Sequence, residues 1–283
     1  MSEVLPPGLH IVATPIGNLG DLSPRAAETL RRADRILAED TRVTGKLLQH
    51  VGAEAPMSRY DDHSSEEERK KIIAELAHSA IALVSDAGTP LISDPGFKLV
   101  RAAREQGYEV HTVPGPSAAI AALTLSGLPT DRFLFAGFLP PREKARMEAI
   151  LELGSIRASL IFYESGPRLH ETLKSLAALL GKRDAAVVRE ISKLHEECVT
   201  GTVGDLAKRY ENLAPKGEIV LVVGPPGRAA EPSDEEVDAA LDSVLGRLSV
   251  SRAAAHVADQ LGIARKRAYA RALELSKDDL GEA

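Results

Sequence analysis

Short apolar runs alternate with stretches of helical spacing through the first part of the chain. The apolar runs have the length and continuous apolar character of buried strands, and they lie at Leu9–Thr14, Arg35–Ala38, Ala80–Ser85 and Tyr108–Val113. Helical patterns lie between them at 23–33, 43–50, from Ser64 or Ser65 onward, and at 95–106. This alternation predicts a largely parallel sheet covered by helices on both faces.

Prolines at 129, 140 and 141 interrupt the rhythm, and a second α/β run follows them. Its helices are expected at 143–153, 167–180 and 203–213, and its strands at 159–163, 185–189 and 219–223. The Gly- and Pro-rich stretch 224–233 reads as a linker, with three short helical patterns and no strand beyond it. We therefore predict an N-terminal α/β domain at 1–127, a second α/β domain at 128–224, and a helical segment at 234–283.

Composition narrows the range of functions that are compatible with this chain. The 283 residues are 44% hydrophobic and 27% charged, which is typical of a globular protein. A net charge of -6 argues against a surface that binds polyanions throughout, and 4% aromatic residues with no Trp make a base-stacking platform a poor explanation. The lone Cys198 excludes an internal disulfide framework and a thiolate metal cluster. No apolar run approaches the roughly 18 residues of a membrane helix, and the start at Met1–Val4 does not resemble a signal peptide. We expect a cytoplasmic protein that has no membrane contact and no metal.

Three strand-to-helix turns in the first part of the chain share one design. They are rich in Gly, Pro and small polar residues, and they span 14–21, 85–96 and 113–119. Neither G-x-G-x-x-G nor a P-loop is present. Because ligands of open α/β sheets bind beyond the carboxyl ends of the strands, we expect one crevice lined mostly by backbone, suited to a small organic cofactor. The simpler alternatives are tight turns, with Asp94 and Ser117 acting only as helix caps.

Charged residues also gather at strand ends elsewhere in the chain, after three strands and at the opening of the last one. They lie in Glu39–Arg42, Phe162–Arg168, Arg189–Glu197 and Lys216–Glu218. Such clusters facing a crevice are candidates for substrate binding or proton transfer. A solvated loop is the alternative for each, and Asp40 with Thr41 could simply cap the next helix.

The C-terminal segment resembles a helix-turn-helix. Ala258 and Gly262-Ile263 occupy its usual small-residue and turn positions. Six cations lie before or within its second helix, at Arg247, Arg252, Arg265, Lys266, Arg267 and Arg271. A phosphate-contacting element and a helical hairpin packed on a neighbouring domain or subunit both fit this pattern.

Taken together, these loops resemble one family. The turns at 14–21, 39–42, 85–96 and 113–119 look like its N-terminal signatures, and 162–168, 189–197 and 216–224 continue the match in order. The family is the ribosomal RNA small-subunit methyltransferase I group of the tetrapyrrole (corrin/porphyrin) methylase superfamily. One departure is visible: the group commonly has Pro-His before the arginine of its Phe-Tyr-Glu-Ser motif, where this chain has Gly166-Pro167.

The resemblance implies two α/β domains of the tetrapyrrole methylase type with a small C-terminal helical appendage. It implies S-adenosyl-L-methionine in the cleft between them, usually in a homodimer, and 2′-O-methylation of a cytidine in the decoding region of 16S rRNA within the small ribosomal subunit. By similarity, the residues expected to contact the cofactor are Leu19, Asp86, Gly88, Thr89, Ser117 and Ala118, with Tyr163 and Glu218 joining from the second domain.

A ribose hydroxyl is a weak acid, so a positioned base or a cation that favours its alkoxide should assist the reaction. Our hypothesis is that Glu190 or Asp40 takes the proton, while Arg42 and Lys193 hold phosphate or polarise the hydroxyl. The rival interpretations are a tetrapyrrole (precorrin-type) C-methyltransferase and a nonenzymatic RNA-binding or ribosome assembly factor. A tetrapyrrole C-methyltransferase would have no use for a basic helical tail. The intact loops at Asp86 and Gly88 argue against a nonenzymatic factor.

Overall fold

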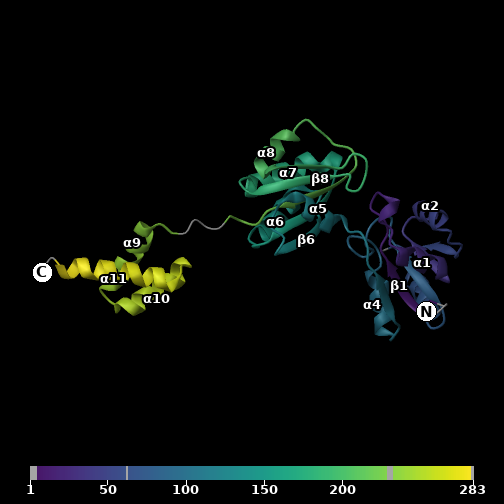
Figure 1. Ribbon diagram of the computed structural model, residues 1–283, viewed down its shortest axis with the longest axis horizontal. Coiled ribbons are helices and arrows are strands. Elements are labelled where there is room, and N and C mark those ends of the chain that lie inside the picture. Colours follow the sequence, from purple (N-terminus) through teal and green to yellow (C-terminus); the bar gives the residue numbers. More distant parts are fainter. Residues whose placement is uncertain (1–4, 62, 228–231, 282–283) are drawn as a thin grey trace. The chain divides into compact units, whose positions relative to one another are not determined.

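The computed structural model describes residues 5–61, 63–227 and 232–281, with the side chains of the last helix described as far as residue 276. The chain divides into two compact units, Met1–Pro225 and Pro226–Ala283 (Figure 1). The first four residues and residues 228–231 of the expected linker lie outside the described part. No helix among the described residues is long and apolar enough to cross a membrane.

The first unit contains two five-stranded sheets. In the first sheet the order is β3-β2-β4-β1-β5 and every pairing is parallel. Its strands are β1 (Gly8–Val12), β2 (Arg35–Ala38), β3 (Met57–Arg59), β4 (Ala80–Val84) and β5 (Val110–Val113). The four strands expected here are present, each within two residues of its expected ends. The short edge strand β3 was not expected, because its sequence Met-Ser-Arg has no apolar run.

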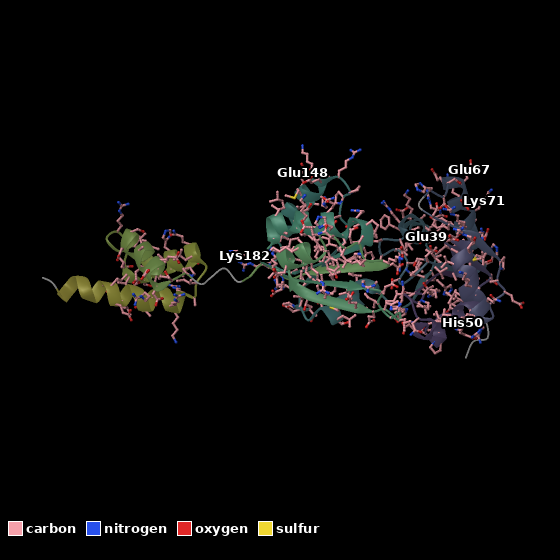
Figure 2. The ribbon with its side chains drawn as sticks, turned by 90° about the horizontal axis from the view of Figure 1, so that it is seen from above. Glu39, His50, Glu67, Lys71, Glu148 and Lys182 are labelled. Atoms are coloured by element: carbon pink, nitrogen blue, oxygen red, sulfur yellow. The ribbon has the colours of Figure 1, made fainter. Side chains whose placement is uncertain are left out.

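Helices cover both faces of this sheet, as expected. They are α1 (Pro24–Arg32), α2 (Thr41–Val51), α3 (Glu66–Glu75) and α4 (Phe97–Glu105). Side chains of α1 and α2 share a buried cluster with one face, and those of α3 and α4 share a cluster with the other. The outer surface of α3 is polar, with Glu67 and Lys71 one helical turn apart (Figure 2). A side-chain oxygen caps three of these helices: Ser23 accepts the Ala26 amide, Asp40 the Arg42 amide and Ser65 the Glu68 amide.

The second sheet has the order β6-β7-β10-β8-β9. Its strands are β6 (Phe133–Phe138), β7 (Ser159–Ser165), β8 (Asp184–Arg189), β9 (Glu197–Thr202) and β10 (Glu218–Val223). Only β6 and β7 pair in parallel, and the other three pairings are antiparallel. The two edge strands β6 and β9 were not expected, and β9 covers the end of a segment that we interpreted as a charged loop.

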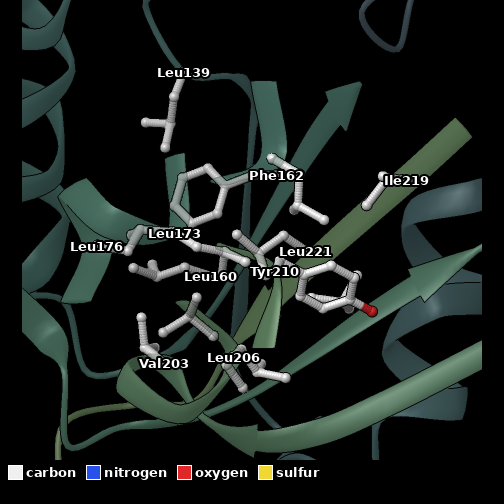
Figure 3. Close-up of a cluster of buried hydrophobic side chains, with 14 of the residues drawn as sticks. Leu139, Leu160, Phe162, Leu173, Leu176, Val203, Leu206, Tyr210, Ile219 and Leu221 are labelled. Atoms are coloured by element: carbon white, nitrogen blue, oxygen red, sulfur yellow. The ribbon is translucent and has the colours of Figure 1, made fainter. Parts of the chain in front are cut away.

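Helices also cover both faces of the second sheet. One face packs on α6 (Glu143–Gly154), α7 (Gly166–Leu180) and α8 (Val203–Arg209) around Phe162 and Leu173 (Figure 3). The other face packs on α5 (Ala118–Ser126) through Ala119, Ala122 and Leu123. By packing, α5 therefore belongs with the second sheet, although it precedes residue 128 in sequence.

The antiparallel pairing brings the charged segments of the second sheet together. Glu218, at the start of β10, pairs with Ser165 at the end of β7, and Ile219 pairs with Arg189 at the end of β8. The starting end of one strand thus lies between the finishing ends of its two neighbours. Three segments that are separate in sequence meet at this edge of the sheet.

The second unit contains the three expected helices, α9 (Asp234–Leu245), α10 (Val250–Leu261) and α11 (Arg265–Gly281). They enclose a small core that includes Val237, Leu241, Val257 and Ala258. The turn between α10 and α11 is made by Gly262, whose φ of 64° is the left-handed conformation that glycine tolerates best. The turn expected at Gly262 is therefore present, and Ala258 lies in the core of this unit.

Candidate functional site

Hydrogen bonds to backbone carbonyls tie together the loops that follow β1, β4 and β5. The amides of Thr14 and Gly88 each donate to the other's carbonyl oxygen, at 2.8 and 3.1 Å. The Thr89 hydroxyl donates to the Pro116 carbonyl at 3.0 Å. Each loop is thus held by its neighbour, which gives this edge of the sheet a fixed shape.

Gly88 shows why these loops need glycine. Its φ is 80°, and a Cβ there would lie 3.3 Å from Ile16 Cγ2 and 3.6 Å from the Pro116 carbonyl oxygen. A side chain would be both strained and crowded. The glycine therefore leaves bare backbone beside the space that the three loops enclose.

That space is a cavity of about 260 Å³ between the two sheets of the first unit. The first sheet's loops supply residues 86–89 and 92–94 with Ile16 and Glu39, and the start of α5 supplies Ser117 and Ala118. The second sheet supplies Phe138, Tyr163, Glu164, Ile191 and residues 218–220. Residues from both halves of the unit therefore converge on one site.

The chemistry of the lining is acidic and apolar. The described lining contains neither Lys nor Arg. Five carboxylates border the cavity, namely Glu39, Asp86, Asp94, Glu164 and Glu218. Apolar side chains such as Ile16, Ile219 and Val220 complete the wall. Because the site lacks a cation of its own, its field favours a ligand that carries positive charge.

Aromatic neighbours fix Tyr163 at the cavity wall. The Phe135 and Phe138 rings meet it edge-on, with centroids 4.8 and 5.6 Å away. Burial raises the pKa of the phenol, against the effect of a hydrogen bond from the Ala119 backbone. Tyr163 is therefore a neutral, rigid group in this site.

Comparison with known proteins decides the family. The family model described as Tetrapyrrole (Corrin/Porphyrin) Methylases matches residues 8–207, and the one described as RsmI C-terminal HTH domain matches residues 231–276. The chain is 56% identical over 274 residues to the ribosomal RNA small subunit methyltransferase I of Erythrobacter litoralis, which covers 97% of both chains. The chain belongs to the ribosomal RNA small subunit methyltransferase I family.

Other members and more distant structures agree. The Escherichia coli O157:H7 member is 44% identical over 273 residues, covering 94% of each chain. A diphthine synthase structure matches with a TM-score of 0.61 at 17% identity, covering 76% of this chain and 89% of that one. A uroporphyrin-III-C-methyltransferase from Thermus thermophilus gives 0.55 at 22% identity, covering 76% and 93%. These structures show that the first unit of this methyltransferase family member has the expected tetrapyrrole methylase fold.

Seven of the eight residues expected at a cofactor site line the cavity, namely Asp86, Gly88, Thr89, Ser117, Ala118, Tyr163 and Glu218. Leu19 lies in a short 3-10 turn (Leu19–Asp21) and is half exposed, outside the lining. Ser117 stands at the start of α5, where its side chain makes no cap hydrogen bond.

Asp40 and Arg42 lie beside the cavity rather than in its lining. Asp40 caps α2, accepting the Arg42 amide at 2.8 Å, so its expected alternative role as a cap is correct. The Arg42 guanidinium donates to the same carboxylate at 2.6 Å and holds the pKa of Asp40 far below its usual range. The Asp40 amide in turn donates to Asp86 at 3.0 Å, which connects this pair to the cavity.

Glu190 and Lys193 form a charged network with Glu218. Lys193 Nζ lies 2.9 Å from Glu218 Oε2 and 3.2 Å from Glu190 Oε1, and the Glu218 amide also donates to Glu190. Burial acts to raise the pKa of Glu190, but the hydrogen bonds from Lys193 and the Glu218 backbone outweigh it and leave that pKa lowered. Burial acts to lower the pKa of Lys193, and the two carboxylates raise it overall. This network adjoins the cavity through Glu218.

The loop that carries this network reaches the first sheet's side of the site. The Ser192 hydroxyl donates to the Asp21 carboxylate, and a side chain added at Gly17 would collide with Lys193, whose Cε would lie 2.9 Å from the new Cβ. Glu190 and Ser192 have φ values of 51° and 65°, which non-glycine residues rarely adopt. Such backbone persists only where its surroundings hold it.

Two acidic residues of the lining, Glu39 and Asp94, are not among the site residues named from the sequence. Glu39 follows β2 in the segment that we interpreted through Asp40 and Arg42. Asp94 belongs to the polar loop 85–96, where a helix cap was the alternative to a ligand contact. The helix α4 begins two residues later than predicted, at Phe97, with Gly96 at its N-cap and no side-chain cap bond. Asp94 therefore does not cap the helix, and the polar loop before Pro95 was the signal that could have placed it at the site.

The Gly166-Pro167 departure has a structural cause. A Cβ at Gly166 would overlap the Pro215 carbonyl oxygen and lie 2.9 Å from its carbonyl carbon. Pro167 stands in the first turn of α7, where its missing amide costs no hydrogen bond. The backbone of this chain thus accommodates glycine at 166 and has no room there for a larger residue.

The six cations of the C-terminal segment divide into two sets. Arg267 pairs with Asp234 at 2.6 Å, and Arg271 pairs with Asp238, so both bind α9 within the unit. Arg247, Arg252, Arg265 and Lys266 are exposed. Only this second set lies on the surface as an available cationic group.

Among the described residues, no group of three or more His, Cys, Asp or Glu is placed to hold a metal ion.

Proposed function

We propose that this chain transfers a methyl group from S-adenosyl-L-methionine to the 2′ hydroxyl of a cytidine in the decoding region of 16S rRNA. The observation that carries the proposal is the near full-length likeness to relatives named ribosomal RNA small subunit methyltransferase I, up to 97% of both chains. The cavity supports it with a donor set suited to that cofactor.

The lining fits the parts of S-adenosyl-L-methionine. A carboxylate such as Asp86 suits a ribose diol, and the apolar wall of Ile219 and Val220 suits a flat base. Ser117 and Ala118 stand at the start of α5, and the N-terminal end of a helix suits a carboxylate. The five lining carboxylates suit a cationic ligand. When bound, the cofactor supplies a methyl group that its sulfonium has already activated.

The remaining task falls to the protein. Its residues must hold the acceptor hydroxyl at near-attack distance, about 3–3.5 Å, and exclude water. Arg42 and Lys193 are cationic groups beside the cavity that would hold RNA phosphate or polarise the hydroxyl. Glu190 and Asp40 remain our candidate proton acceptors from the sequence, and their ion pairs limit both of them in that role.

The substrate is rRNA, which we place within the small ribosomal subunit. The exposed cations Arg247, Arg252, Arg265 and Lys266 would contribute contacts to phosphate. An acidic protein that must meet folded RNA benefits from concentrating positive charge locally, and a homodimer would widen that surface. Analytical ultracentrifugation of the purified chain would test whether it forms the dimer. The reaction would take place in the cytoplasm, where the ribosomal subunits are.

The experiment is transfer of radiolabelled methyl from S-adenosyl-L-methionine to purified small ribosomal subunits, with free rRNA and a tetrapyrrole precursor in parallel. We expect label in the subunit RNA, with one linkage resistant to alkali because its 2′ hydroxyl is blocked. Label only in the tetrapyrrole would replace the substrate while leaving the cofactor. Cofactor binding without any transfer would favour a nonenzymatic RNA-binding role.

A further inference from the structure

We propose that Phe138 stacks on the base of the nucleotide that accepts the methyl group, and so holds that nucleotide at the mouth of the cavity. This inference rests on the proposed function and names a specificity-determining residue for its acceptor. It follows from how the backbone aims the side chain, from the exposure of the ring, and from the groups beside it.

An irregularity in β6 sets the direction of Phe138. Phe135 pairs with Ile161 of β7. The next pairing joins Phe138 to Tyr163, so three steps along β6 match two steps along β7. The extra residue makes this a β-bulge. Gly137 lies in it with a φ of 63°, a left-handed conformation that glycine adopts at little cost.

The bulge turns Phe138 from one face of the sheet to the other. Successive side chains of a regular strand alternate between faces, and Leu134 and Ala136 face the core shared with α6 and α7. Without the extra residue, Phe138 would follow them into that core. Instead its ring lies on the face of Phe135 and Tyr163, where it borders the cavity. Bulges beside functional sites often re-aim a side chain in this way.

The residues on either side hold the ring in place. Leu139 is buried, and its carbonyl accepts a hydrogen bond from Arg168 Nη2 at 2.7 Å. A Cβ at Gly137 would lie 3.0 Å from Ser93 Oγ, so the loop after β4 packs against the bulge. A ring fixed in this way is preorganised for a partner, which lowers the entropy cost of binding.

The ring is open to solvent although it borders the cavity. Phe138 is 55% exposed, whereas Ile219 and Val220 of the same lining are buried. Its exposure leaves a flat apolar surface at the mouth of the cavity. Every nucleobase has a π face, so a single aromatic ring can hold one base without hydrogen bonds. The low aromatic content of the chain argues against a platform for several bases, and one acceptor nucleotide needs only one ring.

The occupant that fits this ring is an RNA base rather than the cofactor. The cofactor would lie inside the cavity, where the buried wall of Ile219 and Val220 suits its own flat base. Because the 2′ hydroxyl of the acceptor must enter the cavity, the base on the same ribose stays at the mouth. Exposed cations follow Phe138 along the chain, at Arg142 and Lys144, and cations suit the phosphates that flank a stacked base.

The test compares Phe138→Ala, Phe138→Leu and Phe138→Trp with the wild-type chain, using Phe133→Ala as the matched control. Phe133 lies at the opposite end of the same strand, is 45% exposed and does not line the cavity. Two quantities are measured: the Kd for S-adenosyl-L-methionine by calorimetry, and kcat/KM for methylation of small ribosomal subunits. A melting curve for each variant shows that it is folded.

Tryptophan fluorescence adds a direct readout of stacking. The chain contains no tryptophan, so Phe138→Trp carries a single reporter at the mouth of the cavity, and Phe133→Trp is the control for its signal. Small subunits are added to each variant, and the fluorescence of the subunits alone is subtracted.

We expect Phe138→Ala to keep Kd within about threefold and to lower kcat/KM about 5- to 150-fold, which corresponds to the loss of one base–aromatic stack. Phe138→Leu should be impaired to a similar degree, because it keeps apolar bulk without a flat π face. Phe138→Trp should retain most of kcat/KM, and small subunits should quench its fluorescence. Phe133→Ala should match the wild type, and Phe133→Trp should show much less quenching.

Three results would overturn the proposal while leaving the proposed function intact. The first is an active wild-type enzyme whose Phe138→Ala variant retains kcat/KM. The second is a rise in Kd as large as the loss of kcat/KM, which would make Phe138 a cofactor contact. The third is full activity in Phe138→Leu, which would make the side chain an apolar cover. A folded wild-type chain that binds the cofactor and methylates no RNA would instead refute the proposed function, and this inference with it.

Discussion

Replacing Gly166 with alanine should destabilise the first unit, because this glycine has no room for a side chain. The new Cβ would overlap the Pro215 carbonyl oxygen and lie 2.9 Å from its carbon, whereas ordinary van der Waals contact begins at about 3.4 Å. Both neighbours are backbone atoms, so the start of helix α7 and the segment before β10 must move apart. Overpacking of this kind costs about 1–3 kcal/mol.

Differential scanning calorimetry measures the effect. For a unit of this size, 1 kcal/mol corresponds to about 2–4 °C in Tm, so Gly166→Ala should melt about 2–12 °C below the wild type. The matched control is Gly45→Ala. Gly45 lies inside α2, where a Cβ would have only the flexible end of Met57 nearby, at 3.9 Å. Alanine there should stabilise by about 0.5–1 kcal/mol, through helix propensity.

The reasoning about Gly166 would be refuted if Gly166→Ala and the wild type melted at the same temperature. A loss of the same size in Gly45→Ala would refute it too, because the cost would then belong to glycine replacement in general. Since residue 215 is followed closely by Glu218 in the cavity lining, the displaced segment should also weaken S-adenosyl-L-methionine binding in Gly166→Ala, and not in Gly45→Ala.

Two further predictions concern the core and the charge at Asp40. Leu173 is fully buried in the cluster of Figure 3, so Leu173→Ala should lower the free energy of unfolding, measured by urea denaturation, by about 2–5 kcal/mol. The control is Leu151→Ala: this leucine is 63% exposed, and its loss should change that free energy by less than about 0.5 kcal/mol. Equal effects of the two substitutions would contradict the packing. The lowered pKa of Asp40 means that its pairing with Arg42 stabilises the fold above the unfolded pKa of about 3.9 and is lost as pH falls through the folded value. The Tm difference between wild type and Asp40→Asn should therefore shrink from pH 7 to pH 3, and a constant difference would argue against the ion pair.

Local sequence chemistry was sufficient to predict most strands of the first sheet and the helices that cover it. Ser23-Pro24 marks the start of α1 through a side-chain cap and a first-turn proline, and both are present. Ser65 caps α3 ahead of three glutamates in the same way. Where apolar runs are continuous, as in Ala80–Val84, the strand is buried on both faces and its pattern is plain.

Edge strands were less visible because they bury little. Met57–Arg59 pairs on one side only, and none of its three residues is buried. Glu197–Thr202 is polar and partly exposed, so its strand state depends on pairing with β8 rather than on its own pattern. The antiparallel order of the second sheet is a tertiary property that the sequence pattern did not reveal.

The site also has a part that the sequence could predict and a part that depends on tertiary contacts. Glycine- and hydroxyl-rich turns after parallel strands must converge at one sheet edge, which is why residues such as Gly88 and Thr89 could be placed from sequence. Which carboxylate remains available in the cavity depends on pairings formed between distant segments, such as Lys193 with Glu218. For that reason the sequence pointed to Glu190 without showing that Lys193 already pairs with it.

The central claim is that the cavity between the two sheets binds S-adenosyl-L-methionine for methyl transfer. Calorimetric binding to the wild type, Ala118→Phe and Ile120→Phe tests it most directly. Ala118 lines the cavity, whereas Ile120 lies two residues further along α5 and is 44% exposed. We predict that Ala118→Phe fills the cavity and abolishes both binding and methylation of small subunits, while Ile120→Phe retains both. Undiminished cofactor binding by a folded Ala118→Phe variant would contradict the account.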